Sequence, residues 1–184
     1  MVKPSHDRAD FSAYIEGMKL TAHNTPYAAL LISGGLLIGA WIFQYGFGYP
    51  PCTMCYWQRH AHKVVLVIAA IAIALTIGGK PLPKLFNTLL ILAFLGSAYF
   101  AFWHVGVEFK IFEGPQTCAA GGGGMVGFDP NDPLGGLDQK IKGPACSEAL
   151  WHFLGLSMAA WNGIISLFGA ALMALSLRKG QANV

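Results

Sequence analysis

Three long runs of uncharged residues constrain this chain more than any other feature of its sequence. They occupy residues 27–47, 86–105 and 153–177, and none contains Asp, Glu, Lys or Arg. Each has about 20 residues or more, enough to cross the ~30 Å hydrocarbon core of a bilayer as an α-helix. Only 11% of all residues are charged, against about 25% in a typical soluble domain. The sequence therefore predicts a multi-pass membrane protein.

A fourth apolar run, residues 64–77, is too short to span a bilayer by itself. It reaches spanning length if its helix begins near Tyr56 and keeps Arg59 and Lys63 in the first turns, at the level of the headgroups. A re-entrant segment is the alternative. We therefore expect a single domain over residues 1–184, an all-α bundle of four transmembrane helices with two outer loops that carry cysteine pairs. The expected boundaries are spans at 27–47, 56–77, 86–105 and 153–177, outer loops at 48–55 and 106–152, a turn at 78–85, and end segments at 1–26 and 178–184.

Lysine and arginine gather in the two end segments and in the turn 78–85, which four spans place on one side. Because basic segments stay in the cytoplasm, we expect them there and the cysteine loops on the outer side, which for a bacterial inner-membrane protein is the periplasm. No cleavable signal is evident, since the first apolar run is long and starts late. One face of the N-terminal segment carries Phe11, Tyr14, Ile15 and Met18, which predicts a helix in the membrane interface; a frayed extension is the alternative. The net charge of +3 is too small to indicate a nucleic-acid partner.

All four cysteines fall in the expected outer loops, Cys52 and Cys55 in the first, Cys118 and Cys146 in the second. Disulfides persist in an oxidising compartment, and the tight ring of a C-x-x-C disulfide is typical of a labile, redox-active bond. Two inert structural disulfides are the alternative. We expect no metal, because Cys118 and Cys146 lie too far apart in the sequence to form a second zinc half-site. Haem attachment would need a histidine where Tyr56 stands.

Arg59 follows Cys55 by one helical turn. A fixed cation and a helix N-terminus both favour the thiolate form of a nearby cysteine. The guanidinium can also donate hydrogen bonds to an oxygen that gains negative charge. We therefore interpret Arg59 as part of a redox site. An arginine that merely extends to the headgroups is the alternative.

Aromatic residues crowd the outer ends of the expected helices, and several histidines lie near the same level. An interfacial belt explains most of the aromatic residues, although a flat apolar slot would also hold a quinone ring. Paired histidines could ligate haem or copper. A haem- or metal-binding membrane electron carrier with structural disulfides is therefore the second functional hypothesis. The histidines in question are His60, His62, His104 and His152.

These residues together resemble the bacterial disulfide bond formation protein B (DsbB) family. The resemblance rests on Pro51-Cys52-x-x-Cys55 with Arg59 four residues later, on the later cysteine pair, and on the segment CSEALWHFLGLSMAAW. It covers most of the chain, roughly residues 27–177. The matched positions of that last segment are Trp151, Phe153, Leu154, Gly155, Leu156, Met158 and Trp161.

Two features depart from the family pattern. Gln58 stands where the family commonly has glutamate, and the glycine-rich residues 121–136 also differ. The vitamin K epoxide reductase-like proteins also couple disulfides to quinones, but their loop pair precedes the C-x-x-C. Here the C-x-x-C comes first, which favours the DsbB family.

The resemblance implies a protein-disulfide oxidoreductase that reoxidises a periplasmic thioredoxin-fold oxidase of the DsbA type. The partner's thiolate would attack Cys118, the freed Cys146 would attack Cys52, and Cys55 would be released as a thiolate beside Arg59. The electrons would pass to a membrane quinone, ubiquinone rather than menaquinone. His104 has a family counterpart, which implies that it lies at the quinone site with Cys55 and Arg59.

Overall fold

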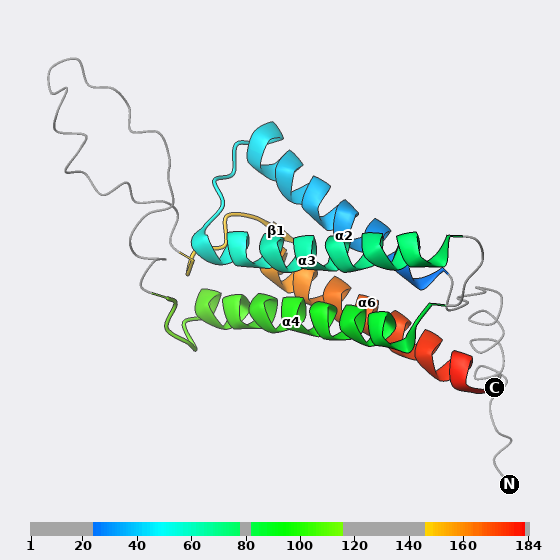
Figure 1. The fold of residues 1–184 in the computed structure, drawn as a ribbon. Coiled ribbons are helices and arrows are strands. Elements are labelled where there is room, and N and C mark those ends of the chain that lie inside the picture. Colours follow the sequence, from blue (N-terminus) through cyan, green and yellow to red (C-terminus); the bar gives the residue numbers. More distant parts are fainter. Residues whose placement is uncertain (1–23, 78–81, 116–145, 183–184) are drawn as a thin grey trace, which may run out of the picture.

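The computed structural model describes residues 24–77, 82–115 and 146–182, and these form a bundle of helices (Figure 1). The helices are α2 (Thr25–Trp41), which continues as the π-helix η1 (Ile42–Gly46), α3 (Thr53–Thr76), α4 (Lys84–Glu108) and α6 (Met158–Ala182). A short antiparallel hairpin, β1 (His152–Phe153) and β2 (Leu156–Ser157), precedes α6. The expected N-terminal interfacial helix, the glycine-rich stretch 121–136 and Cys118 lie outside the described residues.

Among the residues that the structure describes, four helices are long and apolar enough to cross a membrane, over Thr25–Gly46, Thr53–Thr76, Lys84–Glu108 and Met158–Arg178. This confirms the predicted four-helix membrane bundle. The short apolar run reaches full length because its helix begins at Thr53, which adds about three turns of helix before the run of residues 64–77 begins.

Successive helices run in opposite directions, so the ends of α2 and α4 and the starts of α3 and α6 lie at the same end of the bundle (Figure 1). α4 packs along α6, and α3 packs against α2 and α4. The core that joins them is formed by small and large apolar side chains in alternation, which lets the helices approach closely. Its buried members are Ala29, Val65, Ala69, Leu90, Phe94, Ala170 and Met173.

Two boundaries differ from those expected from the apolar runs, and both shape the site. Cys52 is the N-cap of α3, and its sulfur accepts a hydrogen bond from the Cys55 N–H at 3.2 Å, so Cys55 lies in the first helical turn rather than in a loop. The last long helix starts at Met158, because Leu154 (φ 52°) and Gly155 (φ 78°) form the two-residue turn of the hairpin. Positive φ at both turn residues suits a tight hairpin and interrupts the helix.

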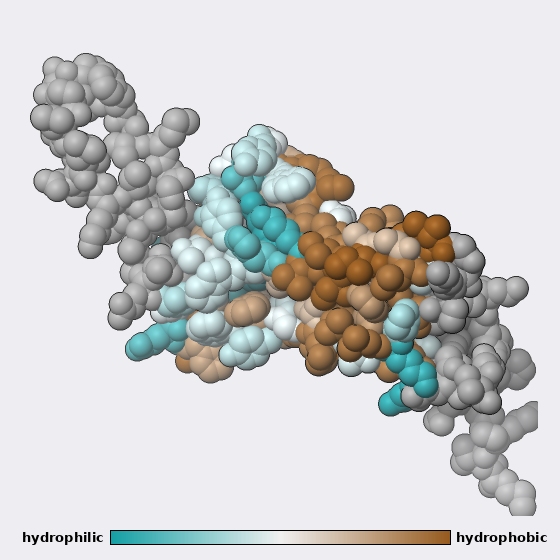
Figure 2. All heavy atoms as spheres, viewed as in Figure 1, coloured by the Kyte–Doolittle hydropathy of each residue, from teal (hydrophilic) through white to brown (hydrophobic). Residues whose placement is uncertain are grey.

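Apolar and polar residues separate along the visible face of the bundle (Figure 2). Hydrophobic side chains cover most of the part nearer the end of α6, and hydrophilic side chains gather toward the opposite end. Exposed large apolar side chains occur on all four long helices, among them Leu31, Val67, Leu92 and Phe168. Such a surface would be unfavourable in water and is expected where lipid surrounds the helices.

Candidate active site

The C-x-x-C thiols lie side by side at the start of α3. Both are free cysteines, and the Cys52 sulfur is 2.9 Å from the Cys55 sulfur. The hydrogen bond with the Cys55 thiol, and secondly burial, raise the pKa of the Cys52 thiol well above its usual range. In the reduced pair, Cys52 is therefore the thiol that retains its proton.

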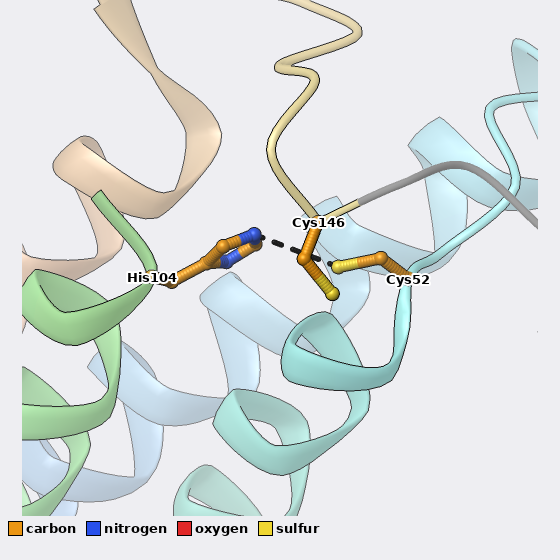
Figure 3. A group of neighbouring side chains, drawn as sticks. All are labelled: Cys52, His104 and Cys146. Atoms are coloured by element: carbon orange, nitrogen blue, oxygen red, sulfur yellow. Dashed lines mark hydrogen bonds between the residues drawn. The ribbon is translucent and has the colours of Figure 1, made fainter. Parts of the chain in front are cut away.

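Cys146 lies beside this pair, although it is distant in the sequence. The Cys146 sulfur, the Cys52 sulfur and a ring nitrogen of His104 all lie within 4.8 Å of one another. Figure 3 shows the three side chains converging from the start of α3, from α4 and from the segment before the hairpin. Cys146 and Cys52 are both buried and pack with Met54 and Val107. A small shift would thus bring the two sulfurs to bonding distance.

Cys146 is itself disulfide-bonded. Cys52 and Cys55 are free, so a bonded cysteine lies beside a dithiol. The cluster of Cys52, His104 and Cys146 has ligand types that suit a soft metal ion. In this arrangement, however, the Cys146 sulfur is already bonded, so it is available to a metal only after reduction.

His104 connects the dithiol to a buried amide. Its Nε2 lies 3.6 Å from the Cys52 sulfur, and its Nδ1 lies 2.8 Å from Nε2 of Gln58. The carboxylate of Glu108, one turn further along α4, is 3.9 Å from His104 Nε2. Both ring nitrogens therefore face polar groups of the protein. His152 lies in the hairpin, in β1.

Arg59 points toward α2 rather than freely into the surroundings. Its guanidinium donates to the side-chain oxygen of Gln44 and, at 3.1 Å, to the carbonyl oxygen of Ala40. It also lies over the ring of Tyr56, 5.5 Å from the centroid. Gln44 belongs to the π-helix η1, an irregularity that often accompanies functional sites. These contacts fix the cation in a defined place on the wall of a cavity.

That cavity, of about 410 Å³, lies among α2, α3, α6 and the segment before the hairpin. Its polar wall contains Cys52, Cys55, Arg59 and His104. Of the predicted site residues that the structure describes, only Cys146 does not line this cavity. The remaining wall is mainly apolar and aromatic. Its aromatic members are Phe43, Tyr49, Trp151, Phe153 and Trp161.

The outer aromatic residues separate into two groups. Phe43 and Trp151 (ring centroids 4.8 Å apart) and the stacked pair Trp151 and Phe153 belong to the cavity wall. A second cluster lies on α3 and α4, where Trp57 contacts Phe100 and Trp103. The sequence could not distinguish the two groups, because both occur at the same level of the helices.

Sequence reasoning missed a set of buried polar side chains that extends the site into the bundle. Asn162 donates to Gln58 at 2.7 Å, and its oxygen lies 2.7 Å from Nε2 of His62. All three side chains line the cavity. The available signal was a lone asparagine inside an uncharged spanning run, since polar residues at membrane depth usually have a structural or functional partner.

Fold and site together define a membrane-embedded thiol–disulfide protein with an apolar cavity beside its dithiol. Comparison with known proteins gives the family. Residues 23–176 match the family model described as "Disulfide bond formation protein DsbB", and the chain therefore belongs to the DsbB family.

Several relatives are named disulfide bond formation protein B. The protein of Azoarcus sp. (strain BH72) is 32% identical over 84% of this chain and 88% of its own length. Disulfide bond formation protein B 2 of Pseudomonas aeruginosa is 29% identical over 80% and 87%. The Pasteurella multocida protein is 31% identical over 79% and 81%. The chain is thus a multi-pass membrane oxidoreductase of disulfide bond formation.

Proposed function

We propose that this protein reoxidises a periplasmic thioredoxin-fold oxidase of the DsbA type and passes the two electrons to a membrane quinone. One observation carries the proposal. The Cys146 sulfur lies within 4.8 Å of the Cys52 sulfur, and Cys52 and Cys55 line an apolar cavity together with Arg59 and His104. In this proposal the disulfide that meets the partner protein and the cavity that receives the electron acceptor are connected through one dithiol.

The exchange begins with both cysteine pairs oxidised. A thiolate of the partner attacks the Cys118 sulfur, the Cys118–Cys146 bond breaks, and Cys146 receives the electron pair as a thiolate. The Cys146 thiolate attacks Cys52, the Cys52–Cys55 bond breaks, and Cys55 leaves as a thiolate near the Arg59 cation. The short reach between Cys146 and Cys52 supports this order, because exchange requires direct approach of the sulfurs.

The return to the starting state uses the partner's second thiolate. It attacks the mixed disulfide and leaves with the partner oxidised, which frees Cys118. Cys118 attacks Cys146, the Cys52–Cys146 bond breaks, and Cys52 closes its bond to Cys55. The two electrons and two protons lost by the partner's dithiol are accepted by the quinone, which is the chemistry that this cofactor supplies.

The residues of the cavity fit a quinone head. A flat apolar ring requires apolar and aromatic walls, which Phe43, Trp151 and Phe153 provide. An oxygen that gains negative charge requires hydrogen-bond donors, and Arg59 stands next to Cys55 on the same face of α3. We assign ubiquinone rather than menaquinone as the acceptor, and the rates with soluble analogues of the two would distinguish them.

Energetics support the need for such an acceptor. DsbA-type oxidases have reduction potentials of about −120 mV, whereas structural disulfides lie below about −300 mV. For two electrons, this gap of about 180 mV corresponds to about 8 kcal/mol. An ordinary disulfide could not reoxidise such a partner. A strongly oxidising quinone could, and it would reach the dithiol from the lipid phase.

The testing experiment combines the purified protein, a reduced thioredoxin-fold partner and a soluble quinone analogue, and follows quinol formation. The parent protein should consume one quinone for each dithiol oxidised. Alanine at any of Cys52, Cys55, Cys118 or Cys146 should abolish turnover. If all four variants reoxidise the partner at the parent rate, the proposed relay is wrong.

A further inference from the structure

We propose that His62, Asn162 and Gln58 form an oriented hydrogen-bond chain that holds His104 as an Nε2–H donor to the Cys52 sulfur. In this assignment Gln58 and Asn162 are positioning residues, and His104 is the group that touches the reacting sulfur. The inference deepens the proposed function, because it rests on the exchange between Cys146 and Cys52.

The hydrogen-bond chain consists of four short contacts, each between side chains of different helices. Ser33 Oγ lies 3.1 Å from His62 Nδ1, and His62 Nε2 lies 2.7 Å from Asn162 Oδ1. Asn162 Nδ2 donates to Gln58 Oε1 at 2.7 Å, and Gln58 Nε2 lies 2.8 Å from His104 Nδ1. The hydrogen-bond chain thus runs from α2 to α3, across to α6, back to α3 and on to α4.

The direction of the chain follows from the amide groups. Gln58 uses its oxygen to accept from Asn162, so the group that it presents to His104 is its NH₂. His104 Nδ1 must then accept. A neutral imidazole carries only one N–H, which therefore lies on Nε2, the nitrogen 3.6 Å from the Cys52 sulfur.

The far end of the chain is consistent with this direction. Asn162 Oδ1 is an acceptor, so His62 Nε2 donates and His62 Nδ1 accepts from the hydroxyl of Ser33. Ser97 lies 3.0 Å from the same His62 nitrogen, and the Ser166 hydroxyl also faces Asn162 Oδ1, at 3.5 Å. With the amide oxygens of Asn162 and Gln58 placed as they are, every donor along the hydrogen-bond chain meets an acceptor.

Burial makes the arrangement rigid. Gln58, His62 and Asn162 are each at most 9% exposed, so water cannot readily replace a lost partner, and an unsatisfied buried amide is costly. Amides pass protons poorly, because proton transfer would require a high-energy tautomer. The hydrogen-bond chain therefore orients the His104 ring and does not conduct protons.

The donor acts when the bond between Cys52 and Cys146 breaks. In that step Cys118 attacks Cys146, and the electron pair of the broken bond goes to the Cys52 sulfur. An N–H aimed at that sulfur stabilises the developing thiolate. Glu108, 3.9 Å from the same nitrogen, and the backbone of Cys146, with which His104 also makes a hydrogen bond, compete for this proton. The hydrogen-bond chain keeps the proton on the side of the ring that faces Cys52.

The first test is nitrogen NMR of the reduced protein with labelled histidine, in the absence of partner and quinone. The parent His104 should be the neutral Nε2–H tautomer. A parent His104 protonated on Nδ1 would overturn the inference, and this measurement requires no variant to fold. Because neither partner nor quinone is present, the result also separates this inference from failure of the proposed function.

The second test uses Gln58→Met and Asn162→Leu, which remove links of the chain while retaining similar side-chain volume. Both should shift His104 toward the Nδ1–H tautomer. In a background of Cys55→Ser and Cys118→Ser, both should also slow the opening of a Cys52–Cys146 disulfide by a small thiol, by about tenfold. Unchanged tautomer and rate in both variants would contradict the proposal.

The matched control is Asn87→Leu. Asn87 is also a buried asparagine in a spanning helix, and it donates to the carbonyl of Met173 at 3.2 Å, away from the cavity. It should change neither the His104 tautomer nor the opening rate. If the control alters them as much as Asn162→Leu does, the effect is one of general packing and the assignment to the chain fails.

Discussion

The Nε2 atom of His104, near the end of α4, lies 3.6 Å from the sulfur of Cys52, which caps the start of α3. This contact means that the dithiol packs against the neighbouring helix α4 in addition to capping the start of α3. Cys146 reaches the same point. In the proposed relay, attack on Cys52 would therefore take place at a buried sulfur, and both thiols of the pair line the apolar cavity.

Replacement of Cys146 by alanine should trap the partner protein. The experiment uses a partner whose second cysteine is replaced by alanine and whose remaining cysteine carries a small aromatic thiol in disulfide linkage. The free Cys118 displaces the small thiol, and the resulting mixed disulfide has neither a Cys146 thiolate nor a second partner thiolate to open it. We expect the mixed disulfide to accumulate at least tenfold over the parent level on non-reducing gels. Cys55→Ala should not give this accumulation, and equal trapping in both variants would argue against separate roles for the two pairs.

Arg59→Ala should impair quinone reduction more than thiol exchange. Loss of a fixed donor and cation beside the reacting group typically lowers the rate by about 100-fold. Arg59→Lys should fall between alanine and parent, because it retains the charge but loses the planar fork that contacts Gln44 and Ala40. Stopped-flow measurement of quinol formation, with varied quinone, gives kcat and KM separately.

The matched control for Arg59 is Lys63→Ala. Lys63 is an exposed cation one turn further along α3 and does not line the cavity. It should leave quinone kinetics unchanged. If Arg59→Ala behaves like this control, Arg59 serves only to anchor the helix at the membrane interface.

The raised pKa of Cys52 depends mainly on Cys55. In Cys55→Ala the sulfur–sulfur hydrogen bond is lost, so the pKa of Cys52 should fall toward its usual value, and its thiolate should form at lower pH than in the parent. The pH midpoint of alkylation, rather than the maximal rate, reports ionisation independently of access. A midpoint that does not move would show that burial alone raises the pKa.

The sequence predicted the bundle well because length and lack of charge are nearly sufficient to define a spanning helix. It placed Arg59 correctly one turn after Cys55, because both lie on α3. It missed the hairpin at residues 152–157, since an apolar strand and an apolar helix start look alike and only the positive φ angles of Leu154 and Gly155 distinguish them. The partners of Gln58 were also beyond reach, because they come from α4 and α6.

Close packing of α4 on α6 depends on the absence of a side chain at Gly169. A Cβ atom there would lie 2.8 Å from the ring of Phe94, which is fully buried. Gly169→Ala should therefore lower the free energy of unfolding by about 1–3 kcal/mol. Gly96→Ala is the control, because a Cβ atom at Gly96 would have no heavy atom within 4 Å. Thermal unfolding in detergent should show a lower midpoint for the first variant only.

Orientation in the membrane can be tested with cysteines introduced at the two ends of the bundle. Cys146 is unsuitable as a reporter, because it is only 2% exposed. Glu113, after α4, and Lys84, at its start, are both exposed. In a background without the native cysteines, an impermeant thiol reagent applied to intact spheroplasts should label Glu113→Cys, whereas Lys84→Cys should be labelled only after the membrane is ruptured. The basic turn before α4 motivates this direction. The reverse labelling pattern would place the cysteine end of the bundle in the cytoplasm, where a periplasmic partner could not reach it.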